Sequence, residues 1–465
     1  MQRERLGSRL GFILLSAGCA IGLGNVYRFP IWTGAYGGAF FVLIYLAFLL
    51  LLGLPVMVME FSVGRASQRS IATSFDVLER KGQKWHLMKY LGIAANYMLM
   101  MFYTTITGWF CVYFVKYLDG SLLSAANDTG ALAGTFVGTI TDLPLNLIIT
   151  AVVLVFGFGV CALGLKKGVE RITKVMMVAL LLLMVGLAVY SFTLPGLGTG
   201  LSFYLMPNGE RLVNSGIWTV ISAAMSQAFF TLSLGIGSMA IFGSYIGKER
   251  SLLGESVTII GLDTLVALVA GLIIFPAYFT FNPGVTEIAA SEAGAGFLFI
   301  TLSGIFNSMG PVVGRIVGTL FFLFMVFAAM STVIAVFENI MSFWLEKTNL
   351  KRWQIALINL GLLFVLCLPF ILCNCLPSWG DFKIFLGKNF GDFEDFLVSY
   401  LALPIGSLVY TLFCTWKFGW GWDNFFTEVN SGAGAKLPAW IRPYVKFVLP
   451  LIILVVLVFS VVTAL

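Results

Sequence analysis

The segment AIGLGNVYRFP, residues 20–30, decides the fold, because it interrupts an apolar stretch with residues that a membrane helix disfavours. Gly22 and Gly24 each cost about 1 kcal/mol in a helix interior relative to alanine. Arg28 adds a charge, and Pro30 lacks the backbone N–H that a regular helix uses. We therefore predict that this helix is broken near Gly22 and that the break has a function.

The composition around this segment is that of a membrane protein. Of the 465 residues, 59% are hydrophobic and only 11% are charged, whereas a soluble chain carries about 25% charged residues. Apolar stretches of about 20 residues, each able to cross a hydrocarbon core of about 30 Å, recur along the chain. They predict an all-α polytopic membrane protein with eleven transmembrane helices, at residues 10–35, 38–63, 90–117, 143–164, 169–192, 215–246, 254–281, 310–345, 353–373, 394–417 and 443–464.

The basic residues lie in alternate connections between these spans and not in one patch, so the net charge of +6 does not indicate a nucleic-acid partner. The connection 118–142 contains no lysine or arginine. The positive-inside rule then places the N-terminus in the cytoplasm, and eleven spans place the C-terminus outside. A cleaved signal peptide is disfavoured, because Arg28 interrupts the first apolar stretch and no clear cleavage site follows it.

Enzymatic and metal chemistry has little support in the sequence. His86 is the single histidine, and the seven cysteines lie mostly within spans without metal-ligand spacing. Cys373 and Cys375 are the one close pair, and we expect them to be free thiols. No hydrolase or nucleotide-binding motif is present, so we expect the protein not to be an enzyme.

A second break is predicted in the sixth span, at TLSLGIG, residues 231–237. The two broken spans are five spans apart, so each begins a five-helix unit, and an odd number of spans gives the two units opposite orientations. Glycine-interrupted segments at matching places of two inverted halves indicate a transporter's central binding site. The alternative is that these glycines only allow neighbouring helices to pack closely. That alternative accounts for a single glycine-rich segment better than for two at matching positions. The predicted units are a first repeat at 1–192, a second repeat at 193–418 with an outer capping loop at 282–309, and a cytoplasmic connection with the last span at 419–465.

The breaks supply oxygen ligands at the middle of the membrane. Unpaired carbonyls bind small cations, and the free amides of a following half-helix bind a carboxylate. Asn25 adds an amide oxygen and Thr231 adds a hydroxyl. A ligand set made only of oxygen suits a hard cation such as Na⁺.

Three stretches, GCAIGLGNVYRFP (18–30), QAFFTLSLGIG (227–237) and GVERITK (168–174), carry a family resemblance. With them the whole chain resembles the neurotransmitter:sodium symporter family, most closely its bacterial amino-acid transporters. The resemblance implies a transporter of the bacterial inner membrane that couples sodium to an amino-acid substrate. It also implies two sodium sites. The first would consist of Ala20, Asn25, Thr231 and Asp263, the last in place of the family's asparagine, and the second of Gly18, Ile21, Ala328, Ser331 and Thr332.

The resemblance also implies where the substrate binds. Its carboxylate would meet the amides near Leu23 and Gly24, the hydroxyl of Tyr103 and the first sodium ion. Gly22 stands where monoamine transporters carry an aspartate, so the implied substrate is an α-amino acid and not an amine. The remaining pocket residues read by position are Leu99, Phe230, Thr231, Ser233, Ile236, Thr332 and Val336, next to Ala20. Their lack of charge favours neutral aliphatic or aromatic side chains, although core packing explains each apolar residue singly.

Chloride-dependent relatives bind chloride near the first sodium site. Tyr45, Gln227 and Thr231 match three of their chloride ligands, but Ala267 replaces the serine. We hypothesise that Asp263 supplies the negative charge, which makes transport chloride-independent, and that it takes up a proton on the return step. The alternative is an aspartate that pairs only with a helix end. Glu60 is expected to brace the breaks and not to bind a ligand.

By the same resemblance two charged pairs close the site. Arg28 would meet Asp395 through water on the outside, unless Arg28 only snorkels to the interface. Arg3 and Glu346 would form the inner latch, with Tyr245 nearby. Two departures concern the inner side, since Leu6 replaces a usual tryptophan and Val178 replaces a proline ten residues after Gly168.

The sequence and the resemblance together predict sodium-coupled symport of neutral hydrophobic L-amino acids by alternating access, with no chloride requirement. The resemblance implies two sodium ions, and the residues alone leave one or two open. The expected partners are a neutral amino acid and the lipid bilayer, and no nucleic acid. A non-transporting receptor of the same fold is the alternative, and it would not need both gates. A channel is disfavoured because no ring of like charges lines a pore.

Overall fold

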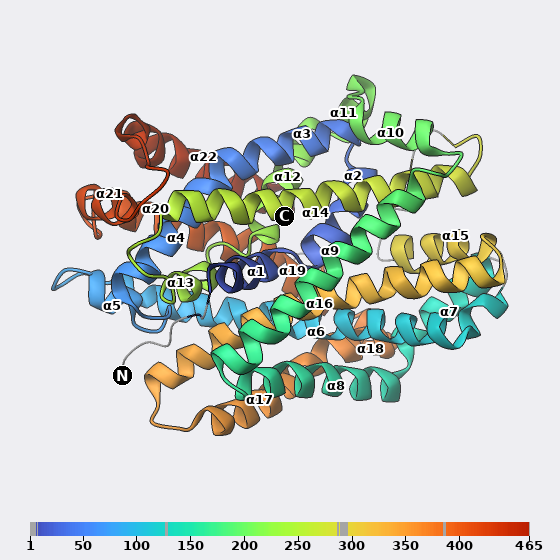
Figure 1. The fold of residues 1–465 in the computed structure, drawn as a ribbon, viewed down its shortest axis with the longest axis horizontal. Helices are drawn as coiled ribbons and strands as arrows, with labels where there is room; N and C mark the ends of the chain where they lie inside the picture. Colours follow the sequence, from blue (N-terminus) through green and yellow to red (C-terminus); the bar gives the residue numbers. More distant parts are fainter. Residues whose placement is uncertain are drawn as a thin grey trace.

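The computed structural model describes residues 6, 8–125, 129–285, 288, 296–384 and 387–464. This part of the chain is helical and contains no strand beyond one isolated bridge between Arg250 and Ala433. The long helices lie side by side along the horizontal of Figure 1. At one end lie α5 (Ser74–Leu78) and α21 (Trp422–Val429), and at the opposite end lie α7 (Thr129–Thr141), α10 (Leu197–Leu205) and α15 (Leu302–Ser308).

The first half of the chain contains the first break and the helices that follow it. In chain order they are α1 (Arg9–Ala20), η1 (Gly24–Arg28), α2 (Phe29–Ala35), α3 (Ala39–Phe48), η2 (Leu49–Gly53), α4 (Leu54–Ser67), η3 (Trp85–Leu87), α6 (Met88–Asp119), η4 (Ser121–Ala125), α8 (Leu143–Ala162), η5 (Leu165–Glu170) and α9 (Arg171–Ser191).

The second half contributes the second break and the long helix α16. Its elements are α11 (Gly209–Asn214), α12 (Ile217–Thr231), α13 (Ser238–Gly243), α14 (Leu252–Phe281), η6 (Phe297–Thr301), α16 (Pro311–Lys347), α17 (Arg352–Cys375), α18 (Pro377–Gly380), α19 (Phe390–Asp395), η7 (Phe396–Ala402), α20 (Leu403–Thr415), η8 (Ala439–Ile441), η9 (Tyr444–Val448) and α22 (Leu449–Ala464).

The predicted spans can be compared directly with these helices. Within the described chain, nine helices are long and apolar enough to cross a membrane, and Arg9–Ala20 with Gly24–Ala35 form a further pair bent by 50°. The predicted sixth span, 215–246, consists of the shorter helices α12 and α13. The all-helical architecture is thus confirmed, whereas the count of eleven spans stays a prediction.

Four π-helical turns share a cause that is visible in the sequence. The turns η1, η2, η7 and η9 each end two residues before a proline, namely Pro30, Pro55, Pro404 and Pro450. A proline has no N–H to donate, and its ring crowds the carbonyl four residues earlier, so the turn before it widens. Proline alone does not suffice, because α14 and α17 contain internal prolines and no such turn. The first of these widened turns lies in the segment that carries Asn25 and Arg28.

Candidate functional site

The first break lies between α1 and η1, where the sequence predicts it. α1 ends at Ala20, Ile21 has an extended backbone with φ −73° and ψ 92°, and helical hydrogen bonding resumes at Gly24. The last carbonyls of a helix have no partner within it, and at the end of α1 those of Gly18 and Cys19 accept hydrogen bonds from side-chain hydroxyls. The N–H groups of Asn25 and Val26 both point back to the Gly22 carbonyl, at 3.1 and 3.3 Å.

The second break, between α12 and α13, depends on glycine. Ser233, Gly235 and Gly237 all have positive φ, of 50°, 85° and 83°. At Gly235 a β-carbon would lie 2.3 Å from the Leu403 carbonyl oxygen, so no other residue fits there. The Glu60 carboxylate accepts the Gly235 N–H at 3.3 Å, as expected of a residue that braces the break.

Three of the four residues of the first predicted sodium site, Asn25, Thr231 and Asp263, lie in contact, and the fourth, Ala20, is the last residue of α1. The Thr231 hydroxyl donates to Asn25 Oδ1 at 3.0 Å and lies 3.2 Å from Asp263 Oδ1. Asn25 Nδ2 donates to the Asp263 carboxylate at 2.9 Å and to its carbonyl at 2.8 Å. These three side chains are at most 1% exposed, and no described basic residue forms an ion pair with Asp263. A buried carboxylate whose hydrogen-bond partners are all neutral favours the binding of a cation that balances its charge.

The five residues of the second predicted sodium site also meet. The Ser331 hydroxyl donates to the carbonyls of Ala328 at 2.9 Å and Ile21 at 3.3 Å. The Thr332 hydroxyl donates to the Gly18 carbonyl at 3.2 Å. α16 thus places two hydroxyls against the carbonyls at the end of α1, and every ligand atom is an oxygen.

A small cavity lies beside these clusters, with Ala20 and Thr332 in its wall. Its volume is about 10 Å³, which leaves room for about one water molecule. The Tyr103 hydroxyl accepts the Leu23 N–H at 2.9 Å, at the place predicted to receive a substrate carboxylate. Since an amino acid is larger than this space, its binding requires the side chains of the wall to move outward.

The structure brings most, but not all, predicted substrate residues into this wall. The lining consists of Cys19, Ala20, Gly22, Gly24, Leu99, Tyr103, Phe230, Ser233, Thr332 and Leu403. Ile236 and Val336 are buried but do not line the cavity, and Thr231 belongs to the sodium cluster. Cys19 and Leu403 were not predicted. Leu403 precedes Pro404 on a distant helix, and no sequence pattern marks it as part of a pocket.

Arg28 and Asp395, the pair predicted as the outer gate, form a direct ion pair. Arg28 Nη1 lies 3.0 Å from Asp395 Oδ1, and it also donates to the Ser399 hydroxyl at 2.7 Å. The guanidinium lies over Trp32, 3.9 Å from the ring centre, and over Phe230 at 4.4 Å. The expected water bridge is therefore replaced by direct contact. Arg28 is only 7% exposed, so it does not snorkel to the membrane interface.

A larger cavity of about 400 Å³ lies beyond this ion pair. Tyr103 and Phe230 line both cavities and separate them, whereas Arg28 and Asp395 line only the larger one. The role of this ion pair as an outer gate stays a prediction.

We expect Asp395→Asn to lower amino-acid uptake by about tenfold, because a buried guanidinium loses a charged hydrogen-bond partner. Uptake into vesicles at fixed sodium measures the effect. Asp392→Asn is the matched control, since Asp392 lines the same outer cavity without bonding to Arg28. Equal uptake by both variants would show that the ion pair is not a gate.

The predicted inner latch is only partly described. Arg3 lies outside the described residues. Glu346 accepts the Ser70 N–H and the Thr73 hydroxyl, both at 2.7 Å. Leu6, which replaces the family's tryptophan, packs against the core.

The Tyr245 hydroxyl donates to Glu338 Oε1 at 3.1 Å. Glu338 is fully buried in α16 and pairs with Arg352 at the start of α17. Sequence reasoning missed this pair, although a carboxylate inside a predicted span was an available signal.

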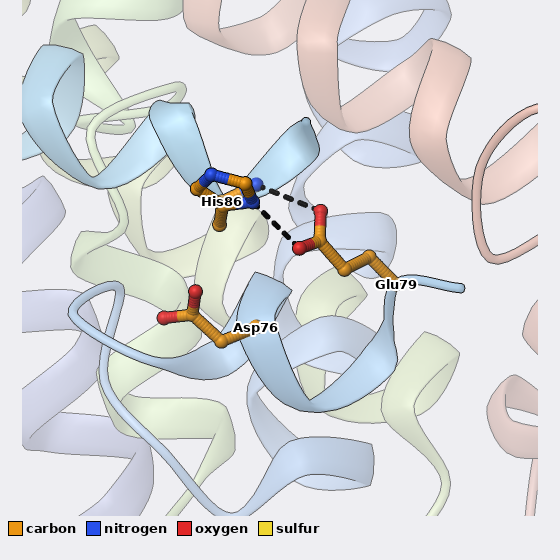
Figure 2. A group of neighbouring side chains, drawn as sticks. All are labelled: Asp76, Glu79 and His86. Atoms are coloured by element: carbon orange, nitrogen blue, oxygen red, sulfur yellow. Dashed lines mark hydrogen bonds and ion pairs between the residues drawn. The ribbon is translucent and has the colours of Figure 1, made fainter. Parts of the chain in front are cut away.

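The described residues contain one group with metal-ligand character, at the end of the molecule that carries α5 (Figure 2). Ligand atoms of Asp76, Glu79 and His86 lie within 4.8 Å of one another. His86 Nδ1 is 2.6 Å from Glu79 Oε1, and Asp76 instead pairs with Lys89 at 3.3 Å and Lys347 at 4.0 Å. Both carboxylates already have protein partners, so we interpret this group as structural. Its ion pair between Asp76 and Lys347 connects α5 to the end of α16.

The predicted chloride ligands surround the first sodium cluster. The Gln227 amide donates to the Gly24 carbonyl at 2.7 Å, and the Tyr45 hydroxyl faces Thr231 and Asp263. Ala267 is buried on α14 one turn from Asp263 and offers no hydroxyl. The only negative charge within this group of side chains is therefore that of Asp263.

The sequence of this chain is similar to a known protein family and to several of its members. Residues 3–128 and 136–465 match the family described as the sodium:neurotransmitter symporter family. The chain is 33% identical over 460 residues to the uncharacterized sodium-dependent transporter YhdH of Bacillus subtilis, covering 97% of this chain and 96% of that protein. It is 28% identical to the sodium- and chloride-dependent GABA transporter 2 of Bos taurus, over 64% of this chain and 55% of that protein.

A solved structure is also similar. The crystal structure of MhsT in complex with L-phenylalanine superposes with a TM-score of 0.87 at 36% identity, covering 98% of this chain and 100% of that one. The similarity therefore extends over the whole membrane region and not only over the two breaks.

Proposed function

This chain belongs to the sodium:neurotransmitter symporter family, and from that premise we propose that it imports neutral hydrophobic L-amino acids together with sodium. The observation that carries the proposal is the buried Asn25–Thr231–Asp263 cluster beside the small cavity. A sodium ion bound there lies next to the place where a substrate carboxylate completes its oxygen shell. Uptake of the amino acid then depends on sodium, and uptake of sodium depends on the amino acid. This coupling needs no enzymatic reaction.

The proposed substrate class follows from the cavity wall. Gly22 leaves the space under Tyr103 and Thr332 free of a side chain, so a substrate carboxylate can occupy it. Leu99, Phe230 and Leu403 give the rest of the wall an apolar character. A charged substrate side chain would lose its hydration there without gaining a partner. The complex of the related MhsT with L-phenylalanine supports this choice.

We assign two sodium ions to the transport cycle, one at each oxygen cluster. The second cluster joins α1 to α16, so a sodium ion at Ser331 and Thr332 holds the two helices together. Its loss to the cytoplasm would release α1. Each sodium ion that enters a negative cell gains about 2.3 kcal/mol per 100 mV, which supplies the driving force.

The proposed orientation places the ends of α5 and α21 in the cytoplasm. This end carries the lysine- and arginine-rich connections, and the opposite end carries α7, whose connection lacks them (Figure 1). In the same proposal the protein lies in a bacterial inner membrane, and α1–α9 and α12–α20 form two inverted repeats. α12 and α13 together then form the remaining span, which gives eleven, with the C-terminus outside.

Uptake of labelled L-phenylalanine and L-leucine into proteoliposomes tests the proposal. An inward sodium gradient should concentrate the amino acid inside, and equal sodium on both sides should not. Binding without accumulation would indicate a receptor, and equilibration without concentration would indicate a channel. Either result would contradict the proposal.

Replacing chloride with gluconate should leave the rate of uptake unchanged, because Asp263 supplies the charge that chloride provides in other members. The measurement compares initial rates at fixed sodium and fixed voltage. A rate that falls with chloride would show that Asp263 does not fill this role.

A further inference from the structure

A groove of about 420 Å³ lies between α6, α8, α9 and α16, and it shares no lining residue with the small cavity. Val152, Phe156 and Val175 line it and are 54%, 48% and 65% exposed. All three belong to helices that are apolar and long enough to span the membrane. The groove therefore opens toward lipid and not toward water.

One charge stands at the edge of this apolar groove. Arg171 is the only charged residue of its lining, and no described carboxylate pairs with it. The adjacent Glu170 lies on the other side of the helix against α1, where it accepts the Ser8 hydroxyl. Lys166 and Lys167 are exposed just before Arg171 in the chain, so the field at this end of the groove is positive.

We propose that this groove binds one anionic phospholipid from the leaflet on the basic side of the membrane. Its acyl chain would lie along the apolar wall, and its phosphate would bind Arg171. Guanidinium groups bind phosphate with two parallel hydrogen bonds, and basic pockets between membrane helices are typical sites for anionic lipid headgroups. A neutral lipid fills the same wall but leaves Arg171 without a counter-charge.

The position of the groove links this lipid to sodium binding. Phe327 and Met330 line the groove, and their neighbours Ala328 and Ser331 on α16 belong to the second sodium cluster. On α9 the lining residue Ile172 precedes Thr173, which packs directly against Gly18 of that cluster. A lipid between α9 and α16 thus braces both walls of the sodium site from behind.

Native mass spectrometry of the purified protein tests the proposal without reference to transport. In an equal mixture of phosphatidylglycerol and phosphatidylcholine, the protein should retain one phosphatidylglycerol. Arg171→Ala should weaken this preference about fivefold, and Arg171→Lys should keep most of it. Lys351→Ala is the control, because Lys351 is exposed and lies outside the groove.

A second variant tests the apolar wall of the groove separately from the charge of Arg171. Val175→Trp fills the groove while Arg171 stays, so the retained lipid should be lost. In liposomes, both Arg171→Ala and Val175→Trp should raise the sodium concentration for half-maximal uptake. Unchanged lipid retention in both variants would overturn the proposal. So would a change in the oligomeric state of Val175→Trp with no change in the retained lipid, since the groove would then be an interface between copies of the chain.

Discussion

Replacing Gly22 with alanine is expected to reduce sodium-driven amino-acid uptake by at least about 100-fold. A β-carbon at this position would lie 2.2 Å from the Thr332 hydroxyl oxygen and 2.4 Å from the Tyr103 hydroxyl oxygen. Both side chains would have to move, and the added methyl group would fill the place assigned to the substrate carboxylate. Uptake and equilibrium binding of labelled phenylalanine should fall together.

The control for this variant is Gly186→Ala on α9, where a β-carbon meets no neighbour within 4 Å. It should transport like the wild type and show that an alanine for glycine exchange is tolerated elsewhere. Thermal unfolding of Gly22→Ala in detergent should remain a single transition close to that of the control. Wild-type binding by Gly22→Ala would place the substrate elsewhere and would refute the assigned site.

Asp263→Asn is expected to raise the sodium concentration for half-maximal uptake by about 100-fold or more. A charge a few ångströms from a bound cation contributes about 4 kcal/mol even at moderate dielectric, and the amide removes this contribution. Asparagine keeps the shape and one oxygen acceptor, so the Asn25 contact at 2.9 Å need not be lost. The change should therefore affect sodium affinity more than stability.

Sodium titration of phenylalanine binding measures this effect directly. Asp423→Asn removes a carboxylate from the exposed surface of α21 and should leave the titration unchanged. If Asp263→Asn also leaves it unchanged, Asp263 is not a ligand of the first sodium ion. Repeating the titration with and without chloride shows whether a chloride ion restores the sodium affinity that is lost with the Asp263 charge.

The sequence contains the signals for the breaks because they depend on local chemistry. Gly22, Gly235 and Gly237 disfavour a helix on their own, and the proline after each of four π-turns is equally visible. Local sequence chemistry does not predict that Asn25, Thr231 and Asp263 meet, since they come from three separate helices. The family resemblance supplied that grouping, and the structure brings the three side chains within hydrogen-bonding distance.

Other features depend on packing between distant helices and leave no local pattern. Leu403 enters the cavity wall because α20 approaches the glycine-rich second break, where the Leu403 carbonyl lies close to Gly235. The direct contact of Arg28 with Asp395 likewise depends on how far the outer helices close. A single sequence predicts which charges pair, but it does not predict whether a water molecule separates them.

In the proposed transport cycle, the charge of Asp263 would determine how the membrane voltage acts on each half of the cycle. Two sodium ions, a zwitterionic amino acid and one carboxylate give the loaded site a net charge of one positive unit. The empty site carries one negative unit. A negative cell interior pulls the loaded site inward and pushes the empty site outward, each by about 2.3 kcal/mol per 100 mV for a full crossing. Voltage then accelerates both halves of the cycle, and a proton taken up by Asp263 on the return would confine the electrical work to the loaded half.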